Sequence, residues 1–217
     1  MADRFAVVTG ATGTLGRELV RLLAGRGLAV VAVSRSGEAV GAGEVVSASA
    51  DLGAAECIAE IRSALPTGGL AWAVHAVGLP PAPNVMDVDP DMLGAAVNIK
   101  AGGMLRLLRA LDDRIVSGSR VVAVGGHLGF EPSEHAPLAG VANAALANLV
   151  GQLEAPLGRR GATIELVAPA YFDSPRTDRM IAARATATGR SPEEVRADLA
   201  PGGRMATAAD VAASILA

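Results

Sequence analysis

Cysteine and aromatic residues are scarce in this 217-residue sequence, in which aromatics make up 2% and Cys57 is the one cysteine. A single thiol excludes an internal disulfide and is typical of proteins from a reducing compartment. Because hydrophobic residues nonetheless make up 51% of the chain, the core must consist of Ala, Val, Leu and Ile. A chain of this length is most simply one domain, and its small side chains suit helices packed closely on a sheet.

The sequence also lacks basic runs and long apolar segments. Its net charge of -3 and isoelectric point near 5.6 disfavour a nucleic-acid-binding surface. The apolar stretch near the N-terminus is too short for a signal peptide. The uncharged stretch 135–153 contains Pro, Asn, Gln and Gly residues, which make it a poor membrane-spanning segment. We therefore expect a cytoplasmic protein that binds neither nucleic acid nor membrane.

Segments of strand and helix character alternate along the chain. Short runs rich in Val and Ala predict six strands, at 4–10, 28–35, 44–48, 70–78, 119–126 and 162–169. Apolar residues at helical spacing predict helices at 14–27, 54–65, 89–113, 136–158 and 207–217. The segment 170–205 is irregular and helical, and we interpret it as lid-like.

This alternation indicates a parallel sheet with helices on both faces. The expected fold is an α/β doubly wound sheet of Rossmann type, with three layers and six strands, in a single domain over 1–217. Ligands of such sheets bind beyond the C-terminal ends of the strands, where the strand order reverses. The loops that matter therefore follow Val8, Val33, Ala48, His75, Val124 and Val167.

The first of these loops, "TGATGTLG", carries Gly10, Gly13 and Gly16 at intervals of three between a strand and a helix. In this context the first glycine permits a tight turn, the second admits a pyrophosphate, and the third lets helix and strand pack closely. Free N–H groups at the start of the helix then face the phosphates. The alternative is an ordinary tight turn, but the context favours nucleotide binding.

At this point the chain resembles a family, the short-chain dehydrogenases/reductases. The loop resembles the family's Thr-Gly-x-x-x-Gly-x-Gly motif, with Thr14 in place of the middle glycine. The tripeptide "ADL" looks like the family's adenine contact, with Asp51 on the amino group. The stretch "VNIKAGGM" matches the helix that carries the family's conserved asparagine, here Asn98.

The resemblance continues to the end of the chain. The stretch 157–174 resembles the family's sixth strand and Pro-Gly turn, with Ala170 for the glycine and Ser174 for the usual threonine. The stretch 202–216 resembles the closing helix, after which the family's seventh strand is expected to be absent. Together these likenesses place a nicotinamide coenzyme against Gly10, Thr12, Gly13, Thr14, Leu15, Gly16, Ser34, Arg35, Ser36, Asp51, Leu52, Ala76, Gly78 and Pro169.

The end of the second predicted strand indicates which coenzyme is preferred. NAD-dependent proteins of this fold usually place a carboxylate there, whereas this chain has Ser34, Arg35 and Ser36. A guanidinium can bind a 2′-phosphate through a forked contact, which favours NADP (as NADPH) over NAD. The alternative is that Arg35 is an ordinary solvated loop residue.

The family's catalytic acid has no counterpart in this sequence. Its reductases use a Tyr-x-x-x-Lys pair on the fifth helix and a serine after the fifth strand. The alignment places Ala139 and Asn143 at the pair and Gly126 at the serine. The one tyrosine is Tyr171 and the one lysine is Lys100, far upstream, so no register restores the pair. Asn98 alone remains, either as a catalytic group or as a structural one that bonds to backbone.

Several polar residues in the loops could replace this acid. His127 leads because it lies one residue beyond the serine position, and an imidazole ordinarily titrates near neutral pH. Tyr171 is the second candidate, and Asp173, Glu131 and His135 are candidates by location only. His75 is interpreted as a hydrogen-bonded residue at a strand end. No metal site is expected.

Two functions remain open at this stage. The first is an NADP-dependent oxidoreductase of carbonyls or enones with a non-standard proton source. The second is a catalytically inactive relative that senses nucleotide or supports a partner. The lid-like segment favours the enzyme, and its arginines suit an anionic or acyl-carrier-bound substrate. A small molecule is the expected ligand, and the small residues of helices 90–111 and 136–158 favour a homodimer or homotetramer.

Overall fold

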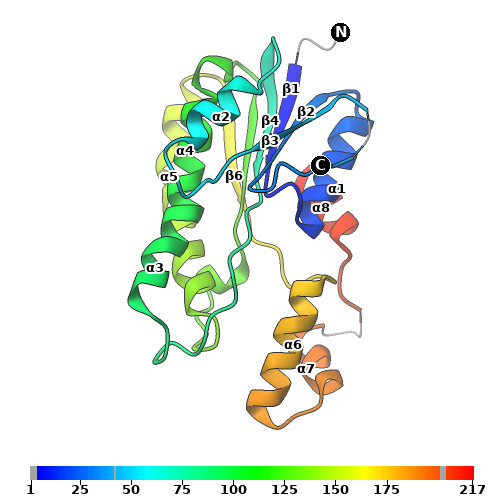
Figure 1. Ribbon diagram of the computed structural model, residues 1–217, viewed down its shortest axis with the longest axis vertical. Helices are drawn as coiled ribbons and strands as arrows, with labels where there is room; N and C mark the ends of the chain where they lie inside the picture. The colour runs from blue at the N-terminus through cyan, green and yellow to red at the C-terminus, as the bar shows by residue number, and fades with distance from the viewer. Residues whose placement is uncertain (1–3, 42, 201–203) are drawn as a thin grey trace.

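The computed structural model describes residues 4–41, 43–200 and 204–217, and within them six parallel strands form one sheet. The strands are β1 (Arg4–Thr9), β2 (Ala29–Ser34), β3 (Val45–Ser49), β4 (Gly69–His75), β5 (Arg120–Val124) and β6 (Thr163–Val167). Their spatial order is β3-β2-β1-β4-β5-β6, so the order reverses between β1 and β4 (Figure 1). This is the predicted doubly wound sheet.

Helices cover both faces of the sheet. They are α1 (Thr14–Gly25), α2 (Cys57–Ser63), α3 (Pro90–Val97), α4 (Gly103–Ala110), α5 (Pro137–Gly158), α6 (Pro175–Thr188), α7 (Pro192–Leu199) and α8 (Ala208–Ile215). Strand residues alternate between the two faces, since Phe5 and Val7 enter one apolar cluster and Ala6 and Val8 the other. The first cluster includes side chains of α2, α4 and α5, and the second includes those of α1 and α8. The three layers are as predicted.

The single helix expected over 90–111 is interrupted by a π-helical turn. This turn, η1, spans Asn98–Gly102 between α3 and α4. A π-turn adds a residue to the helical ring, and such turns occur frequently at functional sites. The close approach of the helix to the sheet explains Gly103, because a Cβ there would lie 3.1 Å from Cβ of Leu52 and 3.3 Å from Cε1 of His75.

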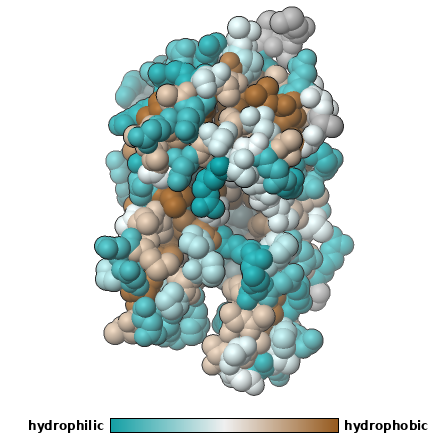
Figure 2. Space-filling model, in the orientation of Figure 1, coloured by the Kyte–Doolittle hydropathy of each residue, from teal (hydrophilic) through white to brown (hydrophobic). Residues whose placement is uncertain are grey.

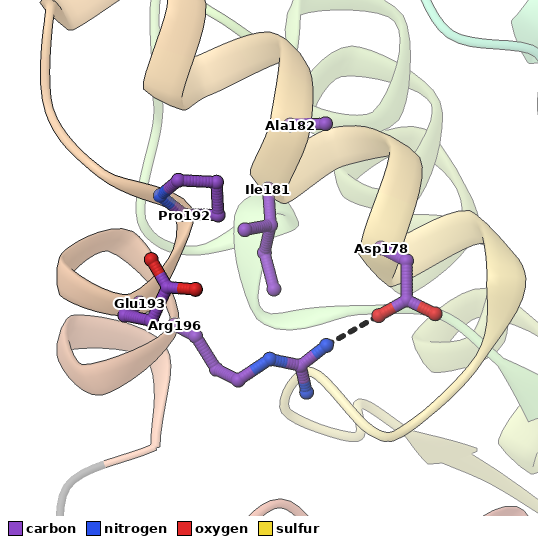
Figure 3. Close-up of a pocket in the computed structure, with 6 residues that line it drawn as sticks. All are labelled: Asp178, Ile181, Ala182, Pro192, Glu193 and Arg196. Carbon is purple, nitrogen blue, oxygen red and sulfur yellow. Dashed lines mark hydrogen bonds and ion pairs between the residues drawn. The ribbon is translucent and has the colours of Figure 1, made fainter.

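The described part of the lid-like segment, which leaves out 201–203, contains two helices with a small core of their own. Ile181, Ala185 and Val195 are buried between α6 and α7, and Ser174 and Ser191 cap the two helices. Figure 3 shows a pocket between these helices, where Arg196 reaches Asp178. No loop at the sheet edge lines this pocket. It therefore belongs to the lid and not to the predicted catalytic site.

The C-terminal ends of the strands face the part of the molecule that carries α3 on one side and α6 and α7 on the other (Figure 1). The space-filling view is notched between these two parts (Figure 2). The predicted coenzyme and catalytic residues follow these strand ends. A search of the described helices for an apolar stretch of membrane-spanning length finds no candidate.

Candidate active site

The loop between β1 and α1 leaves no room for side chains on its glycines. Gly10 has φ +70°, and a Cβ there would lie 2.6 Å from the carbonyl oxygen of Ala76. A Cβ on Gly16 would lie 2.2 Å from the carbonyl oxygen of Gly10. Gly13 caps α1 and presents its first turn of free N–H groups. Backbone this close-packed at a helix N-terminus fits a dinucleotide diphosphate.

The loop after β2 is held by its own hydroxyl groups. Ser34 Oγ accepts a hydrogen bond from the Gly37 amide at 3.1 Å, and Ser49 Oγ donates to the Arg35 carbonyl at 3.0 Å. These bonds fix the backbone and leave the Arg35 side chain exposed. The loop thus presents a guanidinium on a rigid turn.

A second arginine, which the sequence did not single out, joins this loop to the glycine loop. Arg17 Nε donates to the Thr12 carbonyl at 3.1 Å, and its Nη2 lies 2.7 Å from Oε1 of Glu38. Glu38, the first acidic residue after the Ser34–Ser36 turn in the sequence, is therefore paired with a cation. The sequence signal that could have identified Arg17 was its position in the first turn of the helix, three residues beyond Thr14.

Asp51 and Asn98 meet at Gly53. Asp51 Oδ1 accepts from the Gly53 amide at 2.9 Å, and Asn98 Nδ2 donates to the Gly53 carbonyl at 2.8 Å. Arg106 Nη2 donates to Asn98 Oδ1, also at 2.8 Å. Because both ends of the Asn98 amide are engaged, its geometry favours the structural interpretation over the catalytic one. Leu52, which lies between Asp51 and Gly53 in the sequence, is buried.

His75 is fully buried at the end of β4. Its Nδ1 lies 2.9 Å from Oγ1 of Thr9, and its Nε2 lies 3.1 Å from the carbonyl oxygen of Lys100. A carbonyl only accepts, so Nε2 carries the proton and Nδ1 accepts from the threonine. Burial, and secondarily the charge of Lys100, lowers the pKa of His75 to about 3. The interpretation of His75 as a hydrogen-bonded strand-end residue fits this environment.

This buried imidazole makes a testable contribution to stability in acid. Below a pH of about 6.5 the unfolded chain binds a proton at His75 that the folded chain refuses, down to about pH 3. As the pH falls through that window, the free energy of unfolding should decrease by up to about 1.4 kcal/mol per pH unit. Urea unfolding measured across this pH range should show that pH dependence in wild type and in His135→Asn. His75→Asn should lack it. An equal slope in all three proteins would remove His75 as its source.

His127 and Tyr171 come together although they are far apart in the sequence. His127 begins the short 3-10 turn η3 (His127–Gly129) after β5, and Tyr171 follows β6. Their ring centroids are 4.8 Å apart in an edge-to-face arrangement. Burial raises the pKa of Tyr171, an effect that Arg184 and Arg176 partly oppose. A phenol with a raised pKa keeps its proton at neutral pH, so it can still donate a hydrogen bond but releases the proton poorly.

Lys100 also belongs to this edge of the sheet, which the sequence interpretation missed. Its side chain is 5% exposed, and Nζ donates to the Val124 carbonyl, at the end of β5, at 2.8 Å. Burial, and secondarily the charge of Arg176, lowers its pKa to about 7. The available signal was helical spacing, because Lys100 lies four residues from Ala96 and from Met104, both buried.

The fifth helix brings Asn143 to the loop after β5. Its Nδ2 is 2.9 Å from where a Cβ on Gly126 would lie, and its buried Oδ1 has no hydrogen-bond partner among the described residues. Buried polar atoms are rarely left unpaired, so Oδ1 is suited to a ligand or a water. Ala139, one turn earlier, is half-buried.

The sequence profile described as short chain dehydrogenase matches residues 4–185, most of the chain. The chain belongs to the short-chain dehydrogenase family. An uncharacterized oxidoreductase of Staphylococcus epidermidis is 23% identical over 188 residues, which are 81% of each chain.

Solved structures share the fold of this short-chain dehydrogenase. A short chain dehydrogenase family protein from Francisella tularensis has a TM-score of 0.86 at 17% identity, covering 97% of this chain and 88% of that one. An actinorhodin polyketide ketoreductase with NADPH has a TM-score of 0.85 at 20% identity, covering 100% and 90%. The expected fold class is confirmed, and membership of the family implies an oxidoreductase with a nicotinamide dinucleotide.

The other residues proposed for catalysis in this short-chain dehydrogenase are an ion-paired carboxylate and two exposed loop side chains. Asp173 is paired with Arg196 at 3.0 Å. Glu131 and His135 are exposed, and His135 lies 3.5 Å from Glu134. Of the remaining coenzyme candidates, Thr14 and Leu15 open α1, Ala76 and Gly78 follow β4, and Pro169 follows β6.

Proposed function

We propose that this short-chain dehydrogenase is an NADPH-dependent reductase of carbonyls or enones whose proton does not come from a Tyr-x-x-x-Lys pair. One observation carries the proposal. The glycine loop and the His127–Tyr171 pair lie at the same edge of the sheet, so a bound coenzyme and a reducible group can meet there. When bound, NADPH supplies hydride, and the residues of the chain supply placement and charge.

The preference for NADPH rests on charge at the end of β2. Arg35 is exposed there, and Arg17 neutralises Glu38, the acid that would repel a 2′-phosphate. A guanidinium binds phosphate with charge-assisted, often bidentate hydrogen bonds. The presence of NADPH in the actinorhodin ketoreductase structure is consistent with this choice.

His127 and Tyr171 are proposed to hold the substrate oxygen. Both side chains are half-buried, which leaves polar atoms available to a ligand while the rings shield it from water. The buried phenol keeps its proton and can donate a hydrogen bond to a carbonyl. The helices α6 and α7 follow Tyr171 directly, so closure of this segment over a substrate would exclude further water.

Removing the imidazole should impair reduction. We expect His127→Ala to lower kcat/KM by about 10²-fold, the usual loss for one preorganised donor to a developing oxyanion. His135→Ala removes an exposed imidazole from the same loop and serves as the matched control. Consumption of NADPH can be followed with a panel of ketones, quinones and enones.

The two functional readings separate in this assay. Turnover that His127→Ala reduces and His135→Ala preserves supports the reductase. Tight NADPH binding with no turnover on any member of the panel would instead favour a nucleotide-sensing or scaffold protein.

Self-association is proposed through the helical pair α3 and α5, which pack against each other. Val141 on α5 is 48% exposed, and Met86, just before α3, is 88% exposed. Apolar side chains left in water beside such a pair favour a homodimer or homotetramer in the cytoplasm. Sedimentation of wild type and Val141→Asp would test this interface.

A further inference from the structure

We propose that Lys100 delivers the proton to the substrate oxygen in this site, in place of the family's phenol. The inference rests on the proposed reductase function and names the residue that completes it. Three observations carry it: the burial of Lys100 at the sheet edge, its incomplete set of hydrogen bonds, and its position beside the loop where the family has its serine.

The first two observations concern the ammonium group itself. An ammonium has three N–H donors, and that of Lys100 makes one hydrogen bond in the described residues, to the Val124 carbonyl. None of the ion pairs among those residues includes it, so no carboxylate compensates its charge. A buried cation with free donors is costly unless it becomes neutral or binds a ligand. Both responses are what a proton donor requires.

The groups around Lys100 push its proton away. Burial is the larger cause of the lowered lysine pKa, and the charge of Arg176 on α6 adds to it. His75 on β4 bonds to the Lys100 carbonyl and is uncharged at neutral pH, so it does not contribute. No acid opposes this effect. The other charged residues of the helices packed against η1 do not shift it, namely Asp91, Arg106, Arg109 and Glu154. With a pKa of about 7, the group holds a proton in about half of the molecules at neutral pH, which suits a general acid.

The third observation is where Lys100 lies. Its Nζ touches the carbonyl of Val124, two residues before Gly126, where the family resemblance places a serine. Asn143, at the family's lysine position, borders the same loop, with its Nδ2 next to Gly126 and its Oδ1 unpartnered among the described residues. Lys100 and Asn143 therefore both contact the short segment 124–126, and Lys100 has free donors while Asn143 has a free acceptor. The lysine of this site comes from the π-turn and not from the fifth helix.

The proton transfer balances within the proposed reaction. An N–H bond of the Lys100 ammonium breaks, and an O–H bond forms on the carbonyl oxygen. The carbonyl carbon gains hydride from the bound coenzyme, so the substrate is reduced by two electrons and the nicotinamide is oxidised. The neutral amine then recovers a proton from water. For reduction, activity should fall as pH rises through the pKa of Lys100.

The chain offers a direct test that does not depend on activity. Lys100 is the only lysine, so protein grown with ¹⁵N-labelled lysine has a single side-chain nitrogen signal. We expect that signal to titrate near neutral pH in the folded protein, and in the ordinary lysine range after denaturation. Titration of the folded protein in the ordinary range overturns the inference, whatever the activity.

Kinetic variants then test the role in catalysis. We expect Lys100→Met to lower kcat by about 10²–10⁴-fold, the usual contribution of a general acid, with NADPH affinity changed only a few-fold. Lys100→Arg keeps a charge that does not titrate, so it should also lose kcat and lose the fall at alkaline pH. Circular dichroism checks that both variants are folded, and the wild-type titration stands if either is not.

The outcomes separate the inference from the proposed function. Variants that retain wild-type kcat and its pH dependence overturn the inference and leave the reductase in place, with His127 as the next donor to consider. Absence of turnover in wild type overturns both. Titration of the Lys100 side chain near neutral pH, together with the loss of kcat in both variants, supports Lys100 as the proton donor.

Discussion

Replacing Gly16 by alanine is expected to weaken NADPH binding by about 100-fold or more, which corresponds to about 2.7 kcal/mol. An added Cβ would lie 2.2 Å from the carbonyl oxygen of Gly10 and 2.8 Å from Cα of Ala11. Both are backbone atoms, so the loop must move as a whole and α1 must shift relative to β1. The amides that face the coenzyme diphosphate then lose their alignment. Calorimetric titration with NADPH measures the effect.

Gly25→Ala is the matched control for this prediction. It lies on the same helix, but nothing lies within 4 Å of the Cβ that it would gain. Alanine is the better helix former by up to about 1 kcal/mol, so the melting temperature should hold or rise while NADPH affinity stays unchanged. If Gly16→Ala binds NADPH as tightly as Gly25→Ala does, the coenzyme does not use this loop.

Arg35→Ala is expected to weaken NADPH binding by about 10- to 100-fold and to leave NADH binding within a few-fold of wild type. Hydrogen bonds to charged groups contribute about 1.5–3 kcal/mol, and only the 2′-phosphate distinguishes the two coenzymes. The backbone of Arg35 is held by Ser49, so the loop should survive loss of the side chain. Parallel titrations with the two coenzymes give the selectivity ratio.

Arg21→Ala controls for the loss of a positive charge, since Arg21 is an exposed arginine on α1 paired with Glu18. It should change neither affinity by more than a few-fold. Equal weakening of NADPH and NADH by Arg35→Ala would mean that this side chain does not read the 2′-phosphate, and the NADPH assignment would then fail.

The sheet and the tight glycine turn between β1 and α1 were within reach of sequence reasoning because their signals are local. Each predicted strand contains the observed one to within a few residues, since buried parallel strands are continuous apolar runs. Gly10 and Gly16 could be assigned for the same reason, because the steric need for glycine arises within a single turn. The strict alternation of strand and helix then left few topologies to choose from.

The contacts of the proposed catalytic residues, Lys100, His127 and Tyr171, were less predictable because they are not local. Lys100 reaches a backbone oxygen 24 residues away, and only the phase of a helix and the order of β4 and β5 bring the two together. A lysine on an otherwise apolar helix face was the one signal available. Lys100 was set aside because it lies far upstream in the sequence, but residues that are distant in the sequence can be close in the fold. The contact between His127 and Tyr171 likewise depends on β5 and β6 being neighbours.

Calorimetry of the wild-type protein with NADPH and with NADH tests the account most directly, because every proposed step requires a bound coenzyme. We expect NADPH to bind in the micromolar range, NADH to bind more weakly, and the melting temperature to rise with NADPH concentration. No heat and no rise in melting temperature at millimolar concentrations of either coenzyme would contradict it.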